Sequence, residues 1–322
     1  MKIAVFMMAA SKEPSTRNVQ AFKDTIVRYC NENKDKLKNT YDFYVYTCLG
    51  YEDILYRFVK SCNSDHDYDN LYYIVVNERE SVYRTFEKTY CALKYVDEDL
   101  DEKYDLYVRV NISMYLNLDL LDKVADKLKP GNLYCNALNS YINLESEYCN
   151  DIYPRGDLMI FDHSILEKII GDDNDFKFKE DNLEYRPLVN HVDDCLIGLC
   201  LINGFGKDYY KHLYMLKYNY LPDAEIDPRM INTYAIGSRI KTVPPEVGYS
   251  GYSWDDNDYR KKDVEKFHYL YDYYKNRGFD YTGVKMADVL VDKNKSRPTL
   301  FVEADNKNVF DVFWKYLEQK RK

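Results

Sequence analysis

The chain has 322 residues, of which 46% are apolar and 31% are charged, the balance of a globular protein with a sizeable core. Its 45 basic and 54 acidic residues give a formal charge of -9, and the basic residues are scattered along the chain. A nucleic-acid binder needs a concentrated basic surface to displace counterions from phosphates, so this composition disfavours a nucleic-acid partner.

The first 110 residues alternate between strand and helix patterns. A buried strand is predicted at residues 3–10 and a helix at 18–30, where apolar residues recur at helical spacing. Strands at 43–48, 71–76 and 106–110 follow, separated by helices at 52–59 and 81–96. This order predicts an α/β fold of Rossmann-like type, in which helices flank a mostly parallel central sheet.

The second half of the chain is less regular. Helices are predicted at 120–128, 164–170 and 194–203, strands near 133–142 and 158–161, and a tyrosine-rich helix at 262–275. The acidic stretch 172–184 and the proline- and glycine-containing stretch 242–257 are predicted loops. We expect a single domain over residues 1–278, followed by a C-terminal extension at 279–322.

The cysteines and the lengths of the apolar segments indicate the cellular compartment of the protein. The eight cysteines form no Cys-x-x-Cys pair and no zinc spacing with the five histidines, so we expect reduced thiols. The apolar run at 3–10 is too short to cross a bilayer, and no other run approaches the roughly 20 residues required. We therefore expect a cytoplasmic protein without a membrane span.

Ligands of open α/β sheets bind beyond the carboxyl ends of the parallel strands. Neither a Gly-x-Gly-x-x-Gly nor a P-loop sequence follows any predicted strand, which argues against dinucleotide enzymes and P-loop NTPases. Residues at these strand ends, or on the helix that follows, are candidates for binding a nucleotide: Ala9, Ala10, Ser11, Thr47, Asn77, Arg84 and Lys88.

One segment carries a resemblance to a known family. The stretch 104–118, Tyr-Asp-Leu-Tyr-Val-Arg-Val-Asn-Ile-Ser-Met-Tyr-Leu-Asn-Leu, resembles a strand of inverting GT-A glycosyltransferases, especially the β-1,3-galactosyltransferase and fringe-like group. The family pattern has an acidic triplet where this chain has Asn111-Ile112-Ser113. The positions that match in register are Tyr104, Asp105, Arg109, Tyr115, Asn117 and Leu118. The alternative is an ordinary polar turn after a strand.

The resemblance implies a donor site with an altered ion requirement. In the family the triplet holds Mn²⁺ or Mg²⁺, which bridges the two phosphates of a nucleotide sugar. Asn111 and Ser113 lack the anionic charge of that triplet, so we assign no metal ligands and leave metal dependence open. Arg109, Asn111 and Ser113 are placed in the donor site, in the nucleotide-sugar half 1–118.

A second motif lies in the acceptor half, 119–278. The sequence His191-Val-Asp-Asp-Cys-Leu-Ile-Gly198 resembles the family's Glu/Asp-Asp-Val-x-x-Gly motif, which begins a helix. The resemblance implies that Asp194 is the catalytic base, with Asp193 beside it, and that the anomeric configuration is inverted. The alternative reading is that these carboxylates only cap the helix.

Two further groups of residues complete the predicted site. The turn at Gly156 and Asp157 resembles the acceptor-side segment of the family, although an ordinary turn explains it equally well. If no metal is bound, Arg239, Lys241 or Arg260 would supply positive charge to the donor diphosphate; the alternative is that they are solvated surface charges.

The sequence therefore favours a glycosyltransferase that uses a nucleotide sugar, for example a UDP-sugar, and a carbohydrate or glycoconjugate acceptor. One alternative is an inactive GT-A protein that binds carbohydrate or serves as a scaffold, as the missing acidic triplet allows. A metal-dependent nuclease or phosphatase is a third reading, which the acidic composition disfavours.

Overall fold

The structure, a computed structural model, describes residues 1–10, 14–49, 59–62, 68–79, 85–100, 102–140, 152–171, 192–243 and 258–291. Its centre is a sheet of eight strands in the order β11-β7-β10-β5-β1-β2-β4-β3. The strands are β1 (Lys2–Met8), β2 (Thr40–Leu49), β3 (Val59–Cys62), β4 (Leu71–Arg79), β5 (Leu106–Asn111), β7 (Leu133–Cys135), β10 (Leu158–Phe161) and β11 (Leu213–Met215).

The middle of this sheet is parallel. Strands β5, β1, β2 and β4 run in one direction, so their carboxyl ends share one edge. Strand β11 is parallel to β7, whereas β10 is antiparallel to both β5 and β7, and β3 is antiparallel to β4. The predicted mostly parallel α/β sheet is confirmed.

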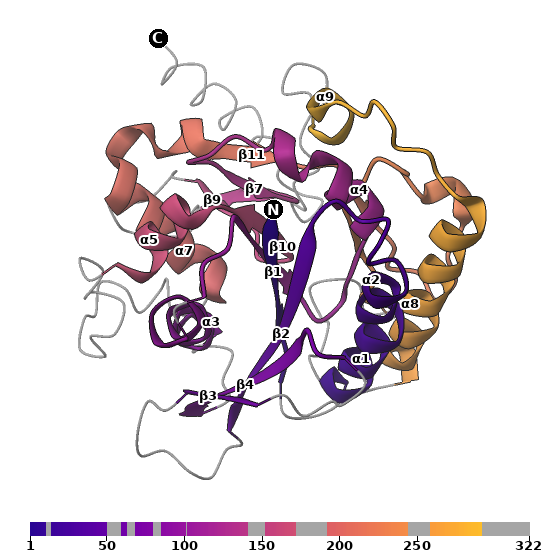
Figure 1. Cartoon of the computed structure of the whole chain (residues 1–322), viewed down its shortest axis with the longest axis horizontal. Helices are drawn as coiled ribbons and strands as arrows, with labels where there is room; N and C mark the ends of the chain where they lie inside the picture. Colours follow the sequence, from indigo (N-terminus) through magenta and orange to yellow (C-terminus); the bar gives the residue numbers. More distant parts are fainter. Residues whose placement is uncertain are drawn as a thin grey trace.

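Helices cover both faces of the sheet (Figure 1). One face carries α3 (Thr85–Lys94), α5 (His163–Ile170) and α7 (Val192–Phe205). The other carries α1 (Ser15–Phe22) and α2 (Arg28–Glu32), joined by a π-helical turn at Lys23–Val27, together with α4 (Leu118–Val124) and α8 (Asp258–Arg277). Shorter helical turns lie at Tyr95–Asp99, Ala125–Lys127, Gly206–His212 and Pro228–Met230, and α9 is Met286–Val289.

Strand alternation gives the sheet two separate apolar faces. Along β1, Ile3 and Val5 pack with α1 and α8 residues, while Ala4 and Phe6 belong to the core under α3, α5 and α7. Successive side chains of a strand point to opposite faces, so a fully buried strand such as β1 needs apolar residues throughout.

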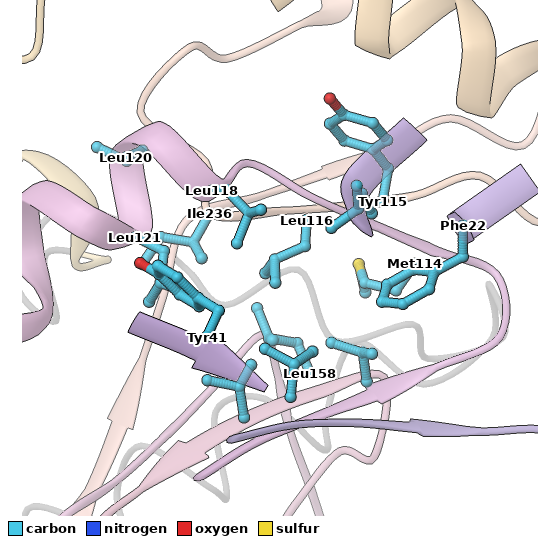
Figure 2. Packing of buried hydrophobic residues seen from close by; sticks show 14 of the residues in the cluster. Phe22, Tyr41, Met114, Tyr115, Leu116, Leu118, Leu120, Leu121, Leu158 and Ile236 are labelled. Atoms are coloured by element: carbon cyan, nitrogen blue, oxygen red, sulfur yellow. The ribbon is translucent and has the colours of Figure 1, made fainter. Parts of the chain in front are cut away.

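Two small sheets complete the fold. Strands β12 (Tyr218–Tyr220), β13 (Gly237–Arg239) and β6 (Met114–Leu116) form one, and β8 (Leu138–Ser140) pairs with β9 (Ile152–Pro154) in the other. Figure 2 shows Met114 and Leu116 of β6 in the apolar core that also contains Phe22, Leu158 and Ile236.

Two predicted elements are corrected by the structure. Val59, expected to end a helix at 52–59, instead begins β3 and pairs with Val76 of β4; residues 51–58 lie outside the described residues. The single strand expected near 133–142 is two strands in different sheets. The chain turns at Asn136, and this turn separates β7 from β8. The Asn136 Oδ1 atom accepts a hydrogen bond of 3.2 Å from Leu158 N.

Other predicted segments are only partly described. The acidic loop 172–184 and residues 244–257 of the second loop lie outside the described residues. Residues 279–291 pack against the main domain: Asn117 Nδ2 donates to Tyr281 Oη at 3.0 Å, and Val291 N donates to Met215 O at 2.9 Å. The boundary at residue 278 stays a prediction, because 292–322 are not described.

No helix in the described part of the chain combines the length and apolar character that a bilayer span requires.

Candidate active site

The carboxyl edge of the parallel strands brings the two resembling motifs together. Strand β5 ends at Asn111, opposite Met8 at the end of β1. The Asn111 N–H donates a hydrogen bond of 2.9 Å to the carbonyl of Asp157, in the turn that precedes β10. This bond fixes the turn 155–157 against β5, the strand that leads into Asn111-Ile112-Ser113. These three residues are called the altered triplet below.

Gly156 in that turn is the contact point with α7. A methyl group at Gly156 would stand 2.8 Å from Asp194 Cγ and 2.9 Å from Arg109 Nη1. Such distances are too short for a real side chain, so only glycine leaves room for the carboxylate and the guanidinium. The predicted base, the predicted acceptor-side glycine and the strand arginine therefore form one group.

The position of Arg109 follows from strand alternation. Arg109 shares a sheet face with Tyr107 and lies opposite Met159 of β10, and both of these neighbours belong to the core under α7. The arginine is 1% exposed and its Nη2 lies 3.3 Å from Met8 Sδ. It was predicted in the donor site; the structure places it beneath the turn, next to Asp194.

The altered triplet forms the polar turn expected as the alternative. Asn111 Oδ1 accepts a hydrogen bond of 3.2 Å from Ser113 N, and both residues are buried. A charged side chain nevertheless contacts this turn. Ser113 Oγ accepts a hydrogen bond of 3.1 Å from Arg260 Nη2 of α8, so a cation already lies at the third position of the triplet.

Strand β13 carries further basic residues to the same place. It pairs antiparallel with β6, which aligns Arg239 with Met114, and Ile240 N donates to Ser113 O at 3.0 Å. Arg239 Nη1 forms a buried ion pair with Asp157. The alternative that Arg239, Lys241 and Arg260 are solvated surface charges is wrong, because each is buried; their role toward a donor diphosphate stays a prediction.

Asp157 joins the main sheet to this basic group. Burial alone would raise its pKa, but Arg239, Arg155 at 2.8 Å and the Asn136 amide at 3.3 Å together hold the pKa below its ordinary value. Its carboxylate is therefore ionised at neutral pH and fully engaged by neighbouring groups. A predicted acceptor contact through the Asp157 side chain finds no support in these bonds.

Arg260 is held by the first turn of α8. Its Nε donates to Asp263 Oδ2 at 2.7 Å, while Asp263 Oδ1 accepts from Thr242 N at 2.8 Å and from Thr242 Oγ1 at 2.9 Å. These bonds lock the end of the β13 segment onto α8. Arg260 and Asp263 are 3% and 0% exposed, so this is an internal anchor.

Lys241 lies within this cluster and has a strongly perturbed pKa. Burial lowers its pKa to about 6, helped by the positive charges of Arg239 and Arg260 and opposed by Asp157 and Asp263. The lysine is 3% exposed. Burial disfavours the charged form of an amine, and neighbouring guanidinium groups add to that effect.

The strand-end residues proposed for the nucleotide form a second group at the same edge. Lys88 of α3 is buried, and its Nζ donates a hydrogen bond of 2.7 Å to the Ala9 carbonyl at the end of β1. Ala10 follows it, and Thr47 lies in β2 next to the Tyr46 carbonyl that accepts from Ala9 N. Ser11, Arg84 and the side chains of Asn77 and Asp193 lie outside the described residues.

Sequence reasoning missed four members of the cluster. Arg155 and Asp263 belong to sequence segments that also contain predicted site residues, Gly156 and Arg260. The charge of each side chain near these residues could have indicated a role in the site. Asn136 and Thr242 gave no signal, because their roles depend on hydrogen bonds to Asp157 and Asp263 made across the fold.

The described residues at this edge offer few free ligands for a divalent cation. Among the described residues no group of three or more His, Cys, Asp or Glu side chains could hold a metal ion. Of the described carboxylates at this edge, Asp157 and Asp263 bind arginines and Asp194 lies beside Arg109, while Ser113 receives Arg260. Hard cations bind free, negatively charged oxygen ligands, and these described groups already contact cations.

Comparisons with known proteins give only distant likenesses. No family model matches the chain, and no curated protein matches it. Among solved structures, the galactosyltransferase LgtC in complex with donor and acceptor sugar analogues has a TM-score of 0.43 and 15% identity, covering 84% of this chain and 95% of that one.

Two others are similar at the same level. A glycosyltransferase involved in glycosylation of the major capsid of PBCV-1 has a TM-score of 0.41 and 8% identity, covering 84% of this chain and 100% of its own. The bifunctional glycosyltransferase WbbM, in its apo form, has a TM-score of 0.41 and 12% identity. The match covers 83% of this chain and 49% of that one. Likenesses this remote decide nothing about activity.

Proposed function

We propose that this chain is a glycosyltransferase of GT-A type, which transfers a sugar from a nucleotide sugar to a carbohydrate or glycoconjugate acceptor. The observation that carries the proposal is the position of Asp194, whose carboxylate lies at Gly156 beside the end of β5. Two short motifs, more than 70 residues apart in the sequence, thus occupy one edge of a parallel sheet, where α/β proteins bind ligands.

The chemistry assigned to this edge is a single displacement with inversion. Asp194 takes the proton of an acceptor hydroxyl as its oxygen forms a bond to the anomeric carbon of the donor sugar. The bond from that carbon to the diphosphate oxygen breaks, and its electron pair leaves with the nucleoside diphosphate. The Arg109 guanidinium lies beside the Asp194 carboxylate at Gly156.

The donor is proposed to lie along the carboxyl ends of β1, β2 and β5. Ala9 and Ala10 present backbone there, and Lys88 fixes the Ala9 carbonyl from below. A UDP-sugar is the first donor to test, as in the inverting group that residues 104–118 resemble. Gly156 would let an acceptor sugar approach the backbone closely.

The direct test is a panel of UDP-, GDP- and dTDP-sugars, with hydrolysis and thermal stabilisation as the two readouts. We expect at least one donor to raise the melting temperature and to be turned over. In Asp194→Asn, turnover should fall at least about 100-fold while donor stabilisation is kept, which is the effect of losing a general base. Asp208→Asn, an exposed carboxylate just after α7, is the matched control.

A non-catalytic carbohydrate-binding protein is the second candidate, favoured by the sequence Asn111-Ile112-Ser113 in place of the acidic triplet. The same panel separates the two. Donor stabilisation without turnover in the unmodified protein would select the binding protein, and the absence of any stabilisation would exclude both.

A further inference from the structure

A small cavity lies where α2, α4 and α8 meet β6, on one face of the main sheet. Helix α7, which carries Asp194, covers the other face (Figure 1). The cavity is therefore separate from the candidate active site. Its walls include four tyrosines from three different segments of the chain: Tyr29, Tyr115, Tyr271 and Tyr274.

The size of the cavity limits what can enter it. Its enclosed volume, counted as space for the centres of water molecules, is about 10 Å³, which is room for one water-sized group. With the outer part that is open to solvent, the free space is about 270 Å³, close to the lower limit for small-ligand sites. A ligand can therefore place one hydroxyl-sized group at the bottom, while the rest of it stays at the mouth.

The Tyr115 side chain brings an unpartnered polar group to this cavity. Figure 2 shows its hydroxyl directed away from Leu116 and Leu158. Its ring stacks on Tyr274, with 5.9 Å between the ring centroids. Tyr115 is 5% exposed, and among the described residues its hydroxyl has no hydrogen-bond partner. Burying a hydroxyl without a partner is unfavourable, so this position favours a polar ligand group.

Asp119 and Lys275 supply an acceptor and a donor to the same cavity. Asp119 Oδ2 accepts a hydrogen bond of 2.6 Å from Tyr29 Oη, and its Oδ1 has no partner in the described part of the chain. Lys275 Nζ donates to Tyr271 Oη at 2.9 Å and to Glu32 Oε2 at 3.2 Å, which leaves its third N–H. The cavity thus combines an anionic acceptor, a cationic donor and a phenol that can do both.

This mixture of groups is suited to a sugar hydroxyl. A simple anion would meet the charge of Asp119 and a simple cation that of Lys275, whereas a hydroxyl donates to one neighbour and accepts from another. The apolar wall, formed by Ile26, Leu116 and Leu118, suits a methylene group. Among the hydroxyls of a hexopyranose, the one on C6 is carried on a methylene that projects from the ring, so it reaches furthest into a narrow cavity.

We propose that this cavity binds the hydroxymethyl group of a hexose and is a second carbohydrate site, apart from the candidate active site. The C6 hydroxyl donates to Asp119 Oδ1 and exchanges a hydrogen bond with Tyr115 Oη, and the sugar ring lies at the mouth beside Lys275. The site goes beyond the proposed function, because it requires neither a nucleotide nor Asp194. In a glycosyltransferase it would hold one hexose of a long glycan away from the reacting end.

The experiment measures binding of D-glucose, D-galactose and D-mannose to the full-length protein by ligand-observed NMR. The matched probe for each hexose is its 6-deoxy counterpart, which lacks only the C6 hydroxyl. We expect at least one hexose to bind and its 6-deoxy counterpart to bind at least about 10-fold more weakly, because hydrogen bonds to a charged group are lost. Equal binding of the two sugars would overturn the assignment of the hydroxymethyl group.

Tyr115→Phe removes only the unpartnered hydroxyl. The variant should melt no lower than the unmodified protein, since no protein hydrogen bond is lost, yet it should bind the hexose at least about 10-fold more weakly. Asp119→Asn keeps an acceptor for Tyr29 and should weaken binding in the same direction. Two controls lie outside the cavity and should bind as the unmodified protein does: Tyr269→Phe, at an exposed position of α8, and Asp126→Asn, at an exposed position just after α4.

The outcomes separate this inference from the proposed function. Asp194→Asn should bind the hexose unchanged. Binding that is lost in Asp194→Asn but kept in Tyr115→Phe belongs to the candidate active site and overturns the cavity site. If no hexose binds, the cavity holds water only and the inference fails even if sugar transfer is found. Binding that requires both Tyr115 and the C6 hydroxyl supports the site even if no nucleotide sugar is turned over.

Discussion

The carboxylate of Asp194 and the guanidinium of Arg109 meet at Gly156, within 3 Å of where a side chain at that glycine would begin. Arg109 comes from the middle strand of the sheet and Asp194 from the start of α7. The turn between them has no spare volume, so the position of the proposed base depends on a glycine in the neighbouring turn.

Gly156→Ala tests that dependence. The added methyl would displace the Asp194 carboxylate and Arg109, and we expect turnover to fall at least about 10-fold, because small misplacements of catalytic groups are costly. Steady-state kinetics with the donor identified by the panel is the measurement. Gly204→Ala, on α7, is the control, since the atoms nearest its methyl belong to the Lys168 side chain and not to the site. Unchanged kinetics in Gly156→Ala would argue against Asp194 as the base.

Asp157→Asn should destabilise the fold. The substitution leaves Arg239 and Arg155 buried without their shared carboxylate, and loss of one member of a buried pair costs about 3 to 5 kcal/mol. Urea unfolding at neutral pH measures this. Asp227→Asn removes an exposed pair with Arg229 and should change the free energy of unfolding little.

The same carboxylate gives a pH dependence. The pKa of Asp157 is lower in the folded protein than its ordinary value of 3.8, so its stabilisation is complete above that value. It is lost as the pH falls through the lower, folded-state pKa. The stability difference between the unmodified protein and Asp157→Asn should therefore shrink in acid, and a constant difference down to the lowest measurable pH would contradict this.

Lys241 predicts a slope of the same sign in a higher pH range. Its pKa of about 6 in the fold lies below the ordinary 10.5, so between these values the unfolded chain binds more protons and stability rises with pH. Relative to Lys241→Met, the free energy of unfolding should rise by up to about 1.4 kcal/mol per pH unit in that window. Urea titrations at several pH values between 7 and 9 provide the comparison, and parallel curves would show that Lys241 keeps its proton.

The C-terminal boundary can be tested by truncation. Residues 279–291 bond to the main domain through Tyr281, which accepts from Asn117 and donates to the Thr233 carbonyl at 2.9 Å. A chain ending at Gly278 should melt at a lower temperature than a chain ending at Val291, because it loses these bonds and the packing of Val284 and Val289. Equal melting temperatures would support a separable extension from residue 279.

The sequence predicted the sheet well because its strands are continuous apolar runs separated by helical periodicity. Val59 was misplaced because four residues of an edge strand resemble the end of an apolar helix. The break at Asn136 was missed because it depends on a hydrogen bond to Leu158, which no local pattern reveals.

The candidate site was predictable only in part, for a physical reason. Asn111, Gly156 and Asp194 were found through their motifs, and strand topology placed them at one edge. The burial of Arg239 and Arg260 was not foreseen, since it depends on the antiparallel register of β13 with β6, more than 100 residues apart in the sequence. Short basic stretches have the same composition whether they face solvent or a buried carboxylate.

The hydrogen bond from Arg260 to Ser113 links two positions that belong to different halves of the chain. An aspartate restored at residue 113 would face a guanidinium and would be neutralised by it. An acidic residue at position 113 would therefore add an internal ion pair with α8. The environment of residue 113 depends on residue 260, so a substitution at one of these positions changes the surroundings of the other.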